Sequence, residues 1–221
     1  MDSSGEPFLY NGQLEEEIPQ TVTHVKVVDP VNKEIGYEAF MSCSQLMSVE
    51  LCEGLERINE GAFQFCRSLT SITIPSTVRD ISEMPFKGCN QLRNAELNEG
   101  LEQINNAVVA YCTSLRRIRI PSTVKEISGE AFYNCHQMMN VELNEGLERI
   151  DEEAFGDCTL LERIIIPSTV NYIHKDAFEG CTSLEAIEFY NEIKQFVNKV
   201  SLQWWNSGVS KASLRTYSFL T

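Results

Sequence analysis

The chain has 221 residues, of which 43% are hydrophobic and 23% are charged. This ordinary composition excludes wholesale disorder, collagen and coiled coil, and no apolar stretch reaches the roughly 18 residues that cross a bilayer. With 18 basic and 32 acidic residues the net charge is −14. Such a charge argues against nucleic acid or an anionic membrane as a non-specific partner.

Residues 1–20 show no hydrophobic periodicity, and we expect them to form a polar, largely flexible lead-in. They carry neither the basic start nor the apolar run that is typical of a secretory signal. We therefore expect a cytoplasmic or otherwise intracellular protein, with an extracellular location left open if the true start lies further upstream. Val25, Val27 and Ile35 then imitate the repeat described next, with one inserted residue before Ile35.

A repeat of 23 residues organises residues 21–189. Seven of the eight cysteines follow it without a slip: Cys43, Cys66, Cys89, Cys112, Cys135, Cys158 and Cys181. Apolar residues alternate in each unit, as in Ile118 and Ile120, which indicates a short strand with one buried face. A second apolar pair, such as Val124 and Ile127, predicts a short second strand. A Phe three residues before most of these cysteines has the spacing of one helical turn and predicts a single-turn helix.

This pattern predicts a repeat solenoid. One unit has too little apolar surface to fold alone, whereas stacked units bury a continuous core between neighbours. Equivalent residues should then lie about 4.8 Å apart in a parallel β-ladder. About seven repeats and a degenerate first unit give eight strand-bearing rungs, a rung being one turn of the solenoid. The repeated cysteines become a column of buried, reduced thiols, and Cys52 alone falls out of register.

A longer period of 46 residues lies on top of the short one. Ile-Pro-Ser-Thr-Val occurs at 74–78, 120–124 and 166–170, and Glu-Gly-Leu-Glu segments occupy the same place in the intervening units. Two corner types therefore alternate along the solenoid. Pro restricts φ in one type, and Gly frees it in the other.

The repeat Leu-x-x-Ile-x-Ile-Pro-x-x-Val-x-x-Ile-x-x-x-Ala-Phe-x-x-Cys resembles the BspA-like class of leucine-rich repeats over about residues 21–189. The alternating corners look most like expanded families in microalgae such as diatoms. The resemblance implies a leucine-rich repeat solenoid that acts as a non-enzymatic protein–protein interaction module or scaffold. A cell-surface recognition or adhesion protein, as some BspA-like members are, is the alternative. Met84-Pro85-Phe86 and Val108-Val109 depart from the Ala-Phe pattern, which puts the turn helix of those two rungs in doubt.

The repeat ends after Phe189, and we expect residues 190–221 to form a helical cap. An apolar stripe with helical spacing follows Asn191, which is a suitable N-cap: Ile193, Phe196, Val197 and Val200. A second short helix is expected over residues 210–220. Trp204 and Trp205 either pack on the last rung or form an exposed contact patch.

No motif in the sequence predicts catalysis or ligand chemistry. The cysteines and histidines lack the clustered spacing of a zinc site, the glycines form no phosphate-binding loop, and no nucleophile has a base beside it. We therefore expect a protein that is not an enzyme and that has no cofactor and no metal. The partner that remains is another protein.

The strands themselves offer the candidate binding surface, because their outward residues lie on the face that solenoids use for partners. The candidates are Glu50, Thr73, Glu96, Arg117, Arg119, Glu142, Arg163, Ile165 and Glu188. One interpretation is a binding surface of alternating charge. The other is self-complementarity of the ladder, in which Arg119 lies between Glu96 and Glu142. We expect a monomer without membrane insertion, with weak self-association through the ends as a possibility.

Overall fold

Each repeat contributes a short strand to one long parallel arrangement, which we call the main ladder. In β10 (Arg117–Arg119) the central Ile118 is buried and the two arginines face outward, as the alternation predicts. The register joins Ile118 to Val141 in the next rung, so equivalent residues lie over one another. The other strands of the main ladder within the repeats are β2 (His24–Val27), β4 (Ser48–Glu50), β6 (Ser71–Thr73), β8 (Asn94–Glu96), β12 (Asn140–Glu142), β14 (Arg163–Ile166) and β16 (Ala186–Tyr190).

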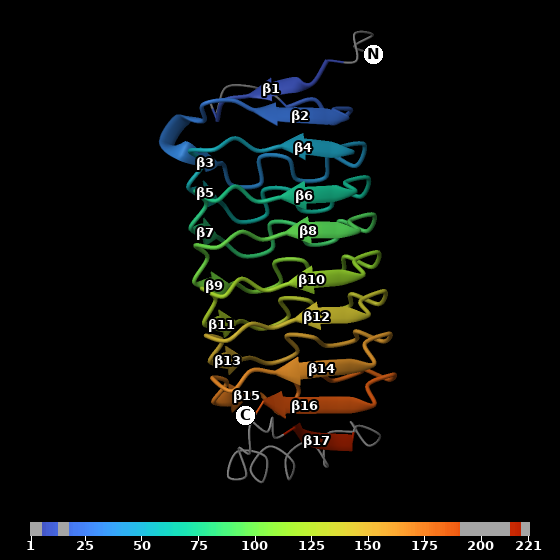
Figure 1. Cartoon of the computed structure of the whole chain (residues 1–221). Coiled ribbons are helices and arrows are strands. Elements are labelled where there is room, and N and C mark those ends of the chain that lie inside the picture. Colours follow the sequence, from blue (N-terminus) through green and yellow to red (C-terminus); the bar gives the residue numbers. More distant parts are fainter. Residues whose placement is uncertain (1–5, 13–17, 191–212, 218–221) are drawn as a thin grey trace.

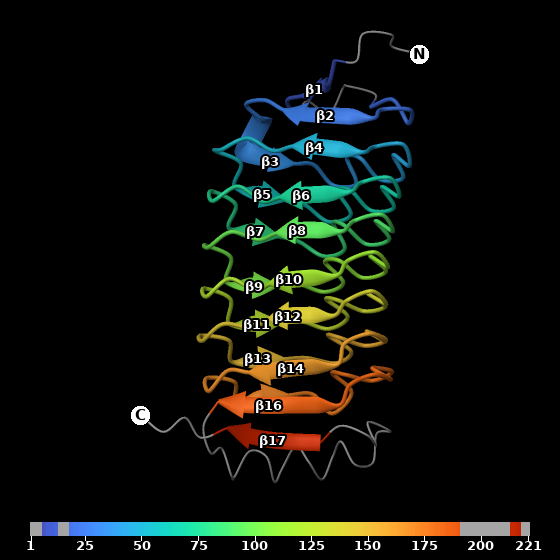
Figure 2. The same cartoon turned by 45° about the vertical axis from the view of Figure 1, so that its right-hand side comes forward.

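The computed structural model describes residues 6–12, 18–190 and 213–217. Its rungs are stacked into an elongated column with the main ladder along one side (Figure 1). Turning the molecule by 45° brings a second ladder into line beside the first (Figure 2). None of the described helices is long and apolar enough to cross a membrane. The predicted parallel β-solenoid is confirmed.

The second ladder consists of two-residue strands, each ending in a buried Ile. They pair in parallel at the same 23-residue interval, as between Ile127 and Ile150. The strands are β3 (Glu34–Ile35), β5 (Arg57–Ile58), β7 (Asp80–Ile81), β9 (Gln103–Ile104), β11 (Glu126–Ile127), β13 (Arg149–Ile150) and β15 (Tyr172–Ile173). The 3-10 helix η1 (Val31–Lys33) occupies the place of the predicted insertion, just before β3.

The N-terminal end differs from the expected flexible lead-in. Residues Phe8–Tyr10 form β1, which pairs in parallel with β2. Tyr10 is buried, its ring meets that of Phe40 edge to face at 4.9 Å, and the backbone N–H of Gly36 donates to its hydroxyl at 3.2 Å. The strand therefore pairs the otherwise open edge of β2 and covers the first Phe ring of the core.

The C-terminal end corrects the helix that was expected over residues 210–220. Ser213–Tyr217 form the strand β17, which pairs in parallel with β16 over its whole length. An open ladder presents unpaired backbone N–H and C=O groups, and a further strand satisfies them in a way that a helix cannot. The amphipathic helix predicted after Asn191, and the patch of Trp204 and Trp205, lie outside the described residues.

The expected single-turn helices are consecutive turns in the structure. In the unit around Phe63, amides at alternate positions bond within the turn, as Gln64 N to Gly61 O at 2.9 Å, and the others bond to the next rung, as Phe63 N to Pro85 O at 2.8 Å. Gly61 and Phe65 have φ of 63° and 60°. These left-handed residues interrupt a helix, and the stacked neighbour supplies acceptors that an isolated helical turn lacks.

The two rungs with unusual sequence keep the same backbone pattern. Pro85 replaces Ala at a position whose amide elsewhere bonds only within the turn, as Ala62 N does to Asn59 O. The amides of Met84 and Phe86, on either side, still bond to the next rung. Proline is therefore tolerated because the amide it lacks takes no part in the stacking.

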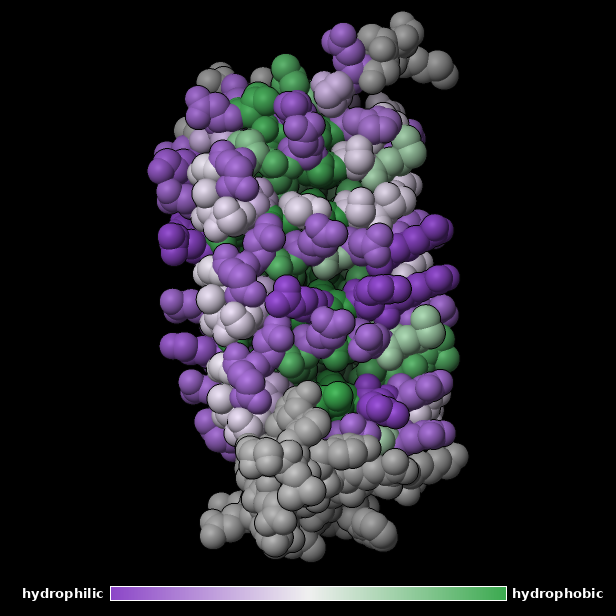
Figure 3. Space-filling model, in the orientation of Figure 1, coloured by the Kyte–Doolittle hydropathy of each residue, from purple (hydrophilic) through white to green (hydrophobic). Residues whose placement is uncertain are grey.

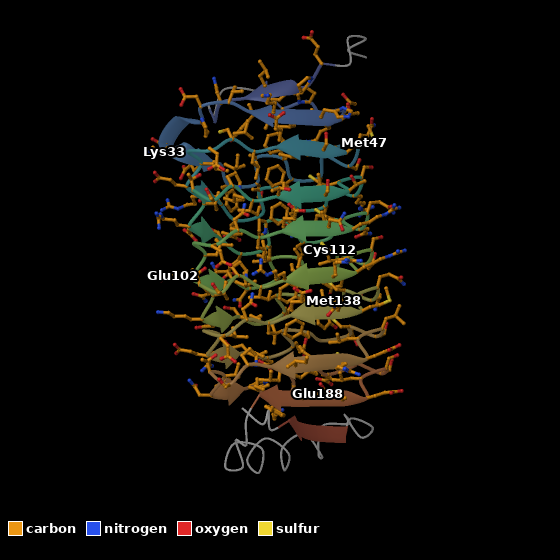
Figure 4. All side chains as sticks on the ribbon, viewed as in Figure 1. Lys33, Met47, Glu102, Cys112, Met138 and Glu188 are labelled. Carbon is orange, nitrogen blue, oxygen red and sulfur yellow. The ribbon has the colours of Figure 1, made fainter. Side chains whose placement is uncertain are left out.

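Aromatic rings and thiols run through the core as parallel columns. Phe40 and Phe63 stack with centroids 5.1 Å apart and planes 1° from parallel, and Phe132 and Phe155 stack at 5.1 Å and 7°. Val109 interrupts the column and is itself buried. Beside the rings, the repeated cysteines are buried and unpaired, as predicted (Cys112 is labelled in Figure 4).

The two corner types interlock, which gives the 46-residue period a structural meaning. The backbone N–H of Gly100 donates to Thr123 Oγ1 in the next rung at 3.1 Å, and that hydroxyl donates to Leu101 O at 2.7 Å. Ser122 Oγ donates to the Glu99 carboxylate at 2.9 Å. Each glycine corner thus pairs with the proline corner that follows it.

Candidate functional site

We define the strand face as the outward first and third residues of the main-ladder strands β4, β6, β8, β10, β12 and β14. Eight of the nine predicted residues lie on it and are exposed: Glu50, Thr73, Glu96, Arg117, Arg119, Glu142, Arg163 and Ile165. The main ladder holds them in two columns. Arg117 and Arg163 are the first residues of their strands, and the other six are the third residues of successive strands. Hydrophilic residues form a band across the middle of this side of the molecule, with hydrophobic residues beside it (Figure 3).

Glu188 does not belong to the exposed surface, which corrects the prediction. It is the third residue of β16 (labelled in Figure 4), and its exposed fraction is only 4%. Arg163 Nε lies 3.5 Å from its Oε1, and that oxygen accepts no hydrogen bond from the described residues. Strand alternation predicts the side from which a side chain leaves but not what covers it, so the sequence could not reveal this burial.

The expected stacking of Arg119 between two carboxylates does not take the form of ion pairs. Thr73 Oγ1 donates to the Glu96 carboxylate at 3.2 Å, which draws that carboxylate toward the preceding rung. Arg119 is opposite Glu142 in the register, yet among the described residues no ion pair joins Arg119 to either glutamate. The predicted self-complementarity of the ladder therefore does not extend to an ion pair at Arg119.

Two further arginines stand beside this surface, and the sequence reasoning missed them. Arg93 and Arg116 directly precede β8 and β10, and both are exposed. Together with Arg117 and Arg119 they form what we call the arginine cluster. In the described parts of the chain none of the four takes part in an ion pair. Because Arg93 and Arg116 are one repeat apart, their common period was the signal that could have revealed them.

Met139 adjoins the arginine cluster, because its backbone N–H donates to Arg116 O at 2.9 Å, and with two exposed apolar residues of the next rung it forms what we call the apolar flank. It comprises Met139, directly before β12, together with Leu160 and Ile165 in the next rung. Their exposed fractions are 52%, 39% and 37%. The surface thus combines guanidinium groups with apolar contacts, a mixture that is typical of protein-binding sites.

The second ladder also carries charges on its outer side, but these charges neutralise one another. Arg57 lies between Glu34 and Asp80, at 3.6 and 3.1 Å from their carboxylates. Lys33 and Glu56 form another pair across neighbouring rungs, at 2.7 Å. Such exposed pairs contribute little stability. They nevertheless distinguish this part of the second ladder from the arginine cluster, in which no arginine takes part in an ion pair among the described residues.

The side of the solenoid that is formed by the consecutive turns, which we call the turn side, is acidic. Glu83, Glu130, Glu152 and Glu153 contribute to an open depression of about 600 Å³ there. Partial burial, together with the carboxylate of Glu179 and the others nearby, raises the pKa of Glu153. A surface of this charge repels anions, in contrast to the arginine cluster.

One group beside this depression has the composition of a metal site. Glu152, His174 and Asp176 place ligand atoms within 4.8 Å of one another. Asp176 is already bound to the ammonium group of Lys175, and its backbone N–H donates to His174 Nδ1 at 3.3 Å. His174 and Asp176 are thus engaged with neighbouring groups inside the turn, whereas Glu152 is exposed.

The thiols are poorly suited to nucleophilic chemistry. Cys112 Sγ donates to the backbone carbonyl of Phe86 in the preceding rung, 3.2 Å away, and Cys135 Sγ does the same to Val109 O at 3.3 Å. Burial raises the pKa of Cys135 to about 12 and holds the pKa of Cys112 well above its usual range. His136 faces away from its neighbouring thiol, with Nδ1 3.1 Å from Asp157 O.

This geometry defines a β-solenoid repeat protein whose coils stack in parallel. The chain belongs to the family described as BspA type leucine-rich repeat region (6 copies), which it matches over residues 20–138 and 102–202. The predicted BspA-like resemblance is thereby confirmed. The likeness to microalgal families stays a prediction.

Solved structures of bacterial leucine-rich repeat proteins share the fold. The T. pallidum leucine-rich repeat protein is 26% identical, with a TM-score of 0.66, over 80% of this chain and 82% of that chain. One from Bacteroides ovatus is 25% identical, with a TM-score of 0.63, over 89% of this chain and 52% of that one. A third, from Eubacterium ventriosum, is 23% identical, with a TM-score of 0.63, over 75% and 42%. This chain thus spans about half the length of the second and less of the third. A comparison with curated proteins finds no match.

Proposed function

We propose that this protein is a non-enzymatic recognition module that binds another protein through its strand face. The observation that carries this proposal is the exposed arginine cluster, which takes part in no ion pair among the described residues and lies beside exposed apolar residues on a chain with a net charge of −14. A stacked ladder holds these side chains on a preformed surface, so little backbone ordering opposes binding. Buried thiols with raised pKa values support the absence of nucleophilic catalysis.

The surroundings that we propose are intracellular, and the proposed free state is a monomer. All eight cysteines are unpaired, including the partly exposed Cys52, which suits a reducing compartment. The high negative charge opposes association of copies. Fractionation of the source cells and light scattering of the purified chain test these two statements separately.

Position-specific photo-crosslinking tests the proposed binding face. A benzophenone amino acid is placed at Thr73 or Ile165 on the strand face, and at the exposed Gln103 of β9 or Glu130 of the turn side as matched controls. Irradiation in an extract of the source organism should give a discrete adduct from the first two positions only. Adducts that form equally from all four positions, or only from the controls, would contradict the proposal.

A further inference from the structure

The arginine cluster concentrates positive charge over two neighbouring rungs. Arg93 and Arg116 occupy equivalent positions one rung apart, directly before β8 and β10. Arg117 and Arg119 point outward from the same face of β10. All four are exposed. Strongly hydrophilic residues are visible at mid-height on this side of the molecule (Figure 3).

The cluster is unfavourable for the isolated chain. Like charges on equivalent positions of adjacent rungs repel one another, whereas a carboxylate at either corner would relieve the repulsion. Six other basic residues have a carboxylate within ion-pair distance: Lys26, Lys33, Arg57, Arg149, Arg163 and Lys175. Arg67, Arg79, Lys87 and Lys125 take part in no ion pair among the described residues, but they do not share two neighbouring strands as the four arginines of the cluster do. Glu96, which could have served Arg119, is instead bonded to Thr73. The missing counter-charge points to a ligand that brings its own.

We propose that the arginine cluster binds an acidic, extended segment of a partner protein. The proposal rests on the proposed function and names the partner's chemistry. Guanidinium groups bind carboxylates through paired, charge-assisted hydrogen bonds, and arginine is enriched at the centres of protein interfaces. The apolar flank of Met139, Leu160 and Ile165 accommodates an apolar side chain of the same segment.

A peptide fits this surface better than the other polyanions do. Glu142 follows the cluster in the next rung, and Glu162 and Glu185 occupy the positions equivalent to Met139 in the two rungs after that. The positive region therefore ends after a short distance. A nucleic acid would carry its phosphates onward over these carboxylates. A second copy of this chain is opposed by the net charge of −14 on each molecule. An acidic segment with apolar residues between its carboxylates matches both the cluster and the flank.

The test measures fluorescence anisotropy of a labelled peptide that repeats Glu-Leu-Glu-Ser, beside the same peptide with Gln in place of Glu. The full chain is compared with R116E/R117E and with the control R79E/K125E. The control changes net charge equally, at exposed corners that precede β7 and β11 of the second ladder. We expect the Glu peptide alone to bind, the cluster variant to weaken it about tenfold or more, and the control to leave it unchanged. Circular dichroism verifies that both variants fold.

Three outcomes would overturn the proposal. They are equal binding of the two peptides, equal loss in the two variants, and binding of a DNA duplex as tight as that of the Glu peptide with the same dependence on the cluster. A strand face that crosslinks at Thr73 and Ile165 while the Glu peptide fails to bind would refute the acidic chemistry and leave the proposed binding face intact. Absence of strand-face crosslinks would instead refute the proposed function.

Discussion

At the scale of single residues, the cysteine column shows why a thiol suits this position. The side chain is small enough for a rung spacing of about 4.8 Å, yet it also donates a hydrogen bond, which alanine cannot do. Cys66, Cys89, and Cys112 donate in turn to the carbonyls of Phe40, Phe63 and Phe86. Each thiol thus supplies a partner to a carbonyl of the preceding rung.

Replacing Cys112 by Ala should therefore destabilise the fold. The variant loses the buried sulfur and leaves Phe86 O without the thiol donor, and we expect a cost of about 1–3 kcal/mol in the free energy of unfolding. Urea unfolding measures it. Cys52→Ala is the control, because Cys52 is only partly buried and off the column, and it should stay within about 0.5 kcal/mol of the wild type. Equal effects of the two substitutions would contradict this role of the column.

At the scale of elements, the turns show how a stack tolerates local irregularity. The rung that contains Val109 keeps the backbone pattern of its neighbours. The N–H of Val109 donates to Ala131 O in the next rung, and the N–H of Ala110 donates within the turn to Ala107 O. The side chains differ more than the backbone. In the next rung a small Ala131 is followed by a large Phe132, whereas Val108 and Val109 are two side chains of medium size.

Val109→Phe alone should overfill its rung, because Val108 keeps the space that Ala leaves free elsewhere. We expect the single substitution to destabilise by about 1–3 kcal/mol. The double substitution V108A/V109F restores the common pattern and should return to within about 1.5 kcal/mol of the wild type, as volume-conserving changes do. Thermal and urea unfolding of the three proteins measure the coupling. A single variant as stable as the double one would show that the ring column had unfilled space at Val109.

The sequence was sufficient to predict the ladders because period and alternation directly express stacking and burial. Cys43 to Cys181 define the register, and pairs such as Ile118 and Ile120 define the inner face. The turns escaped prediction because a spacing of three residues fits a helical turn and a pair of tight turns equally well. Glu188 was misplaced because its burial depends on three-dimensional surroundings. Arg93 and Arg116 were missed because they precede the strands rather than lie in them.

At the scale of the whole molecule, a solenoid must protect its two ends, since each exposes a cross-section of the core and an unpaired ladder. The N-terminal solution is β1, which adds backbone pairing through Phe8–Tyr10 and an aromatic cover through Tyr10. At the other end β17 extends the ladder beyond β16. The rungs between these strands hold the strand face, and with it the candidate binding site, away from the ends.

Removing the aromatic cover should convert the N-terminal end into an association site. Tyr10→Ala exposes the ring of Phe40 and removes the hydroxyl that accepts from Gly36 N, and we expect lower stability, by about 2–5 kcal/mol, with concentration-dependent oligomers. Leu9→Ala is a matched control in the same strand, because Leu9 is 56% exposed and should have little effect. Light scattering across a range of concentrations measures the mass of both variants. If Tyr10→Ala stays monomeric and melts like the control, β1 does not protect the core, and another segment must keep the column from joining end to end.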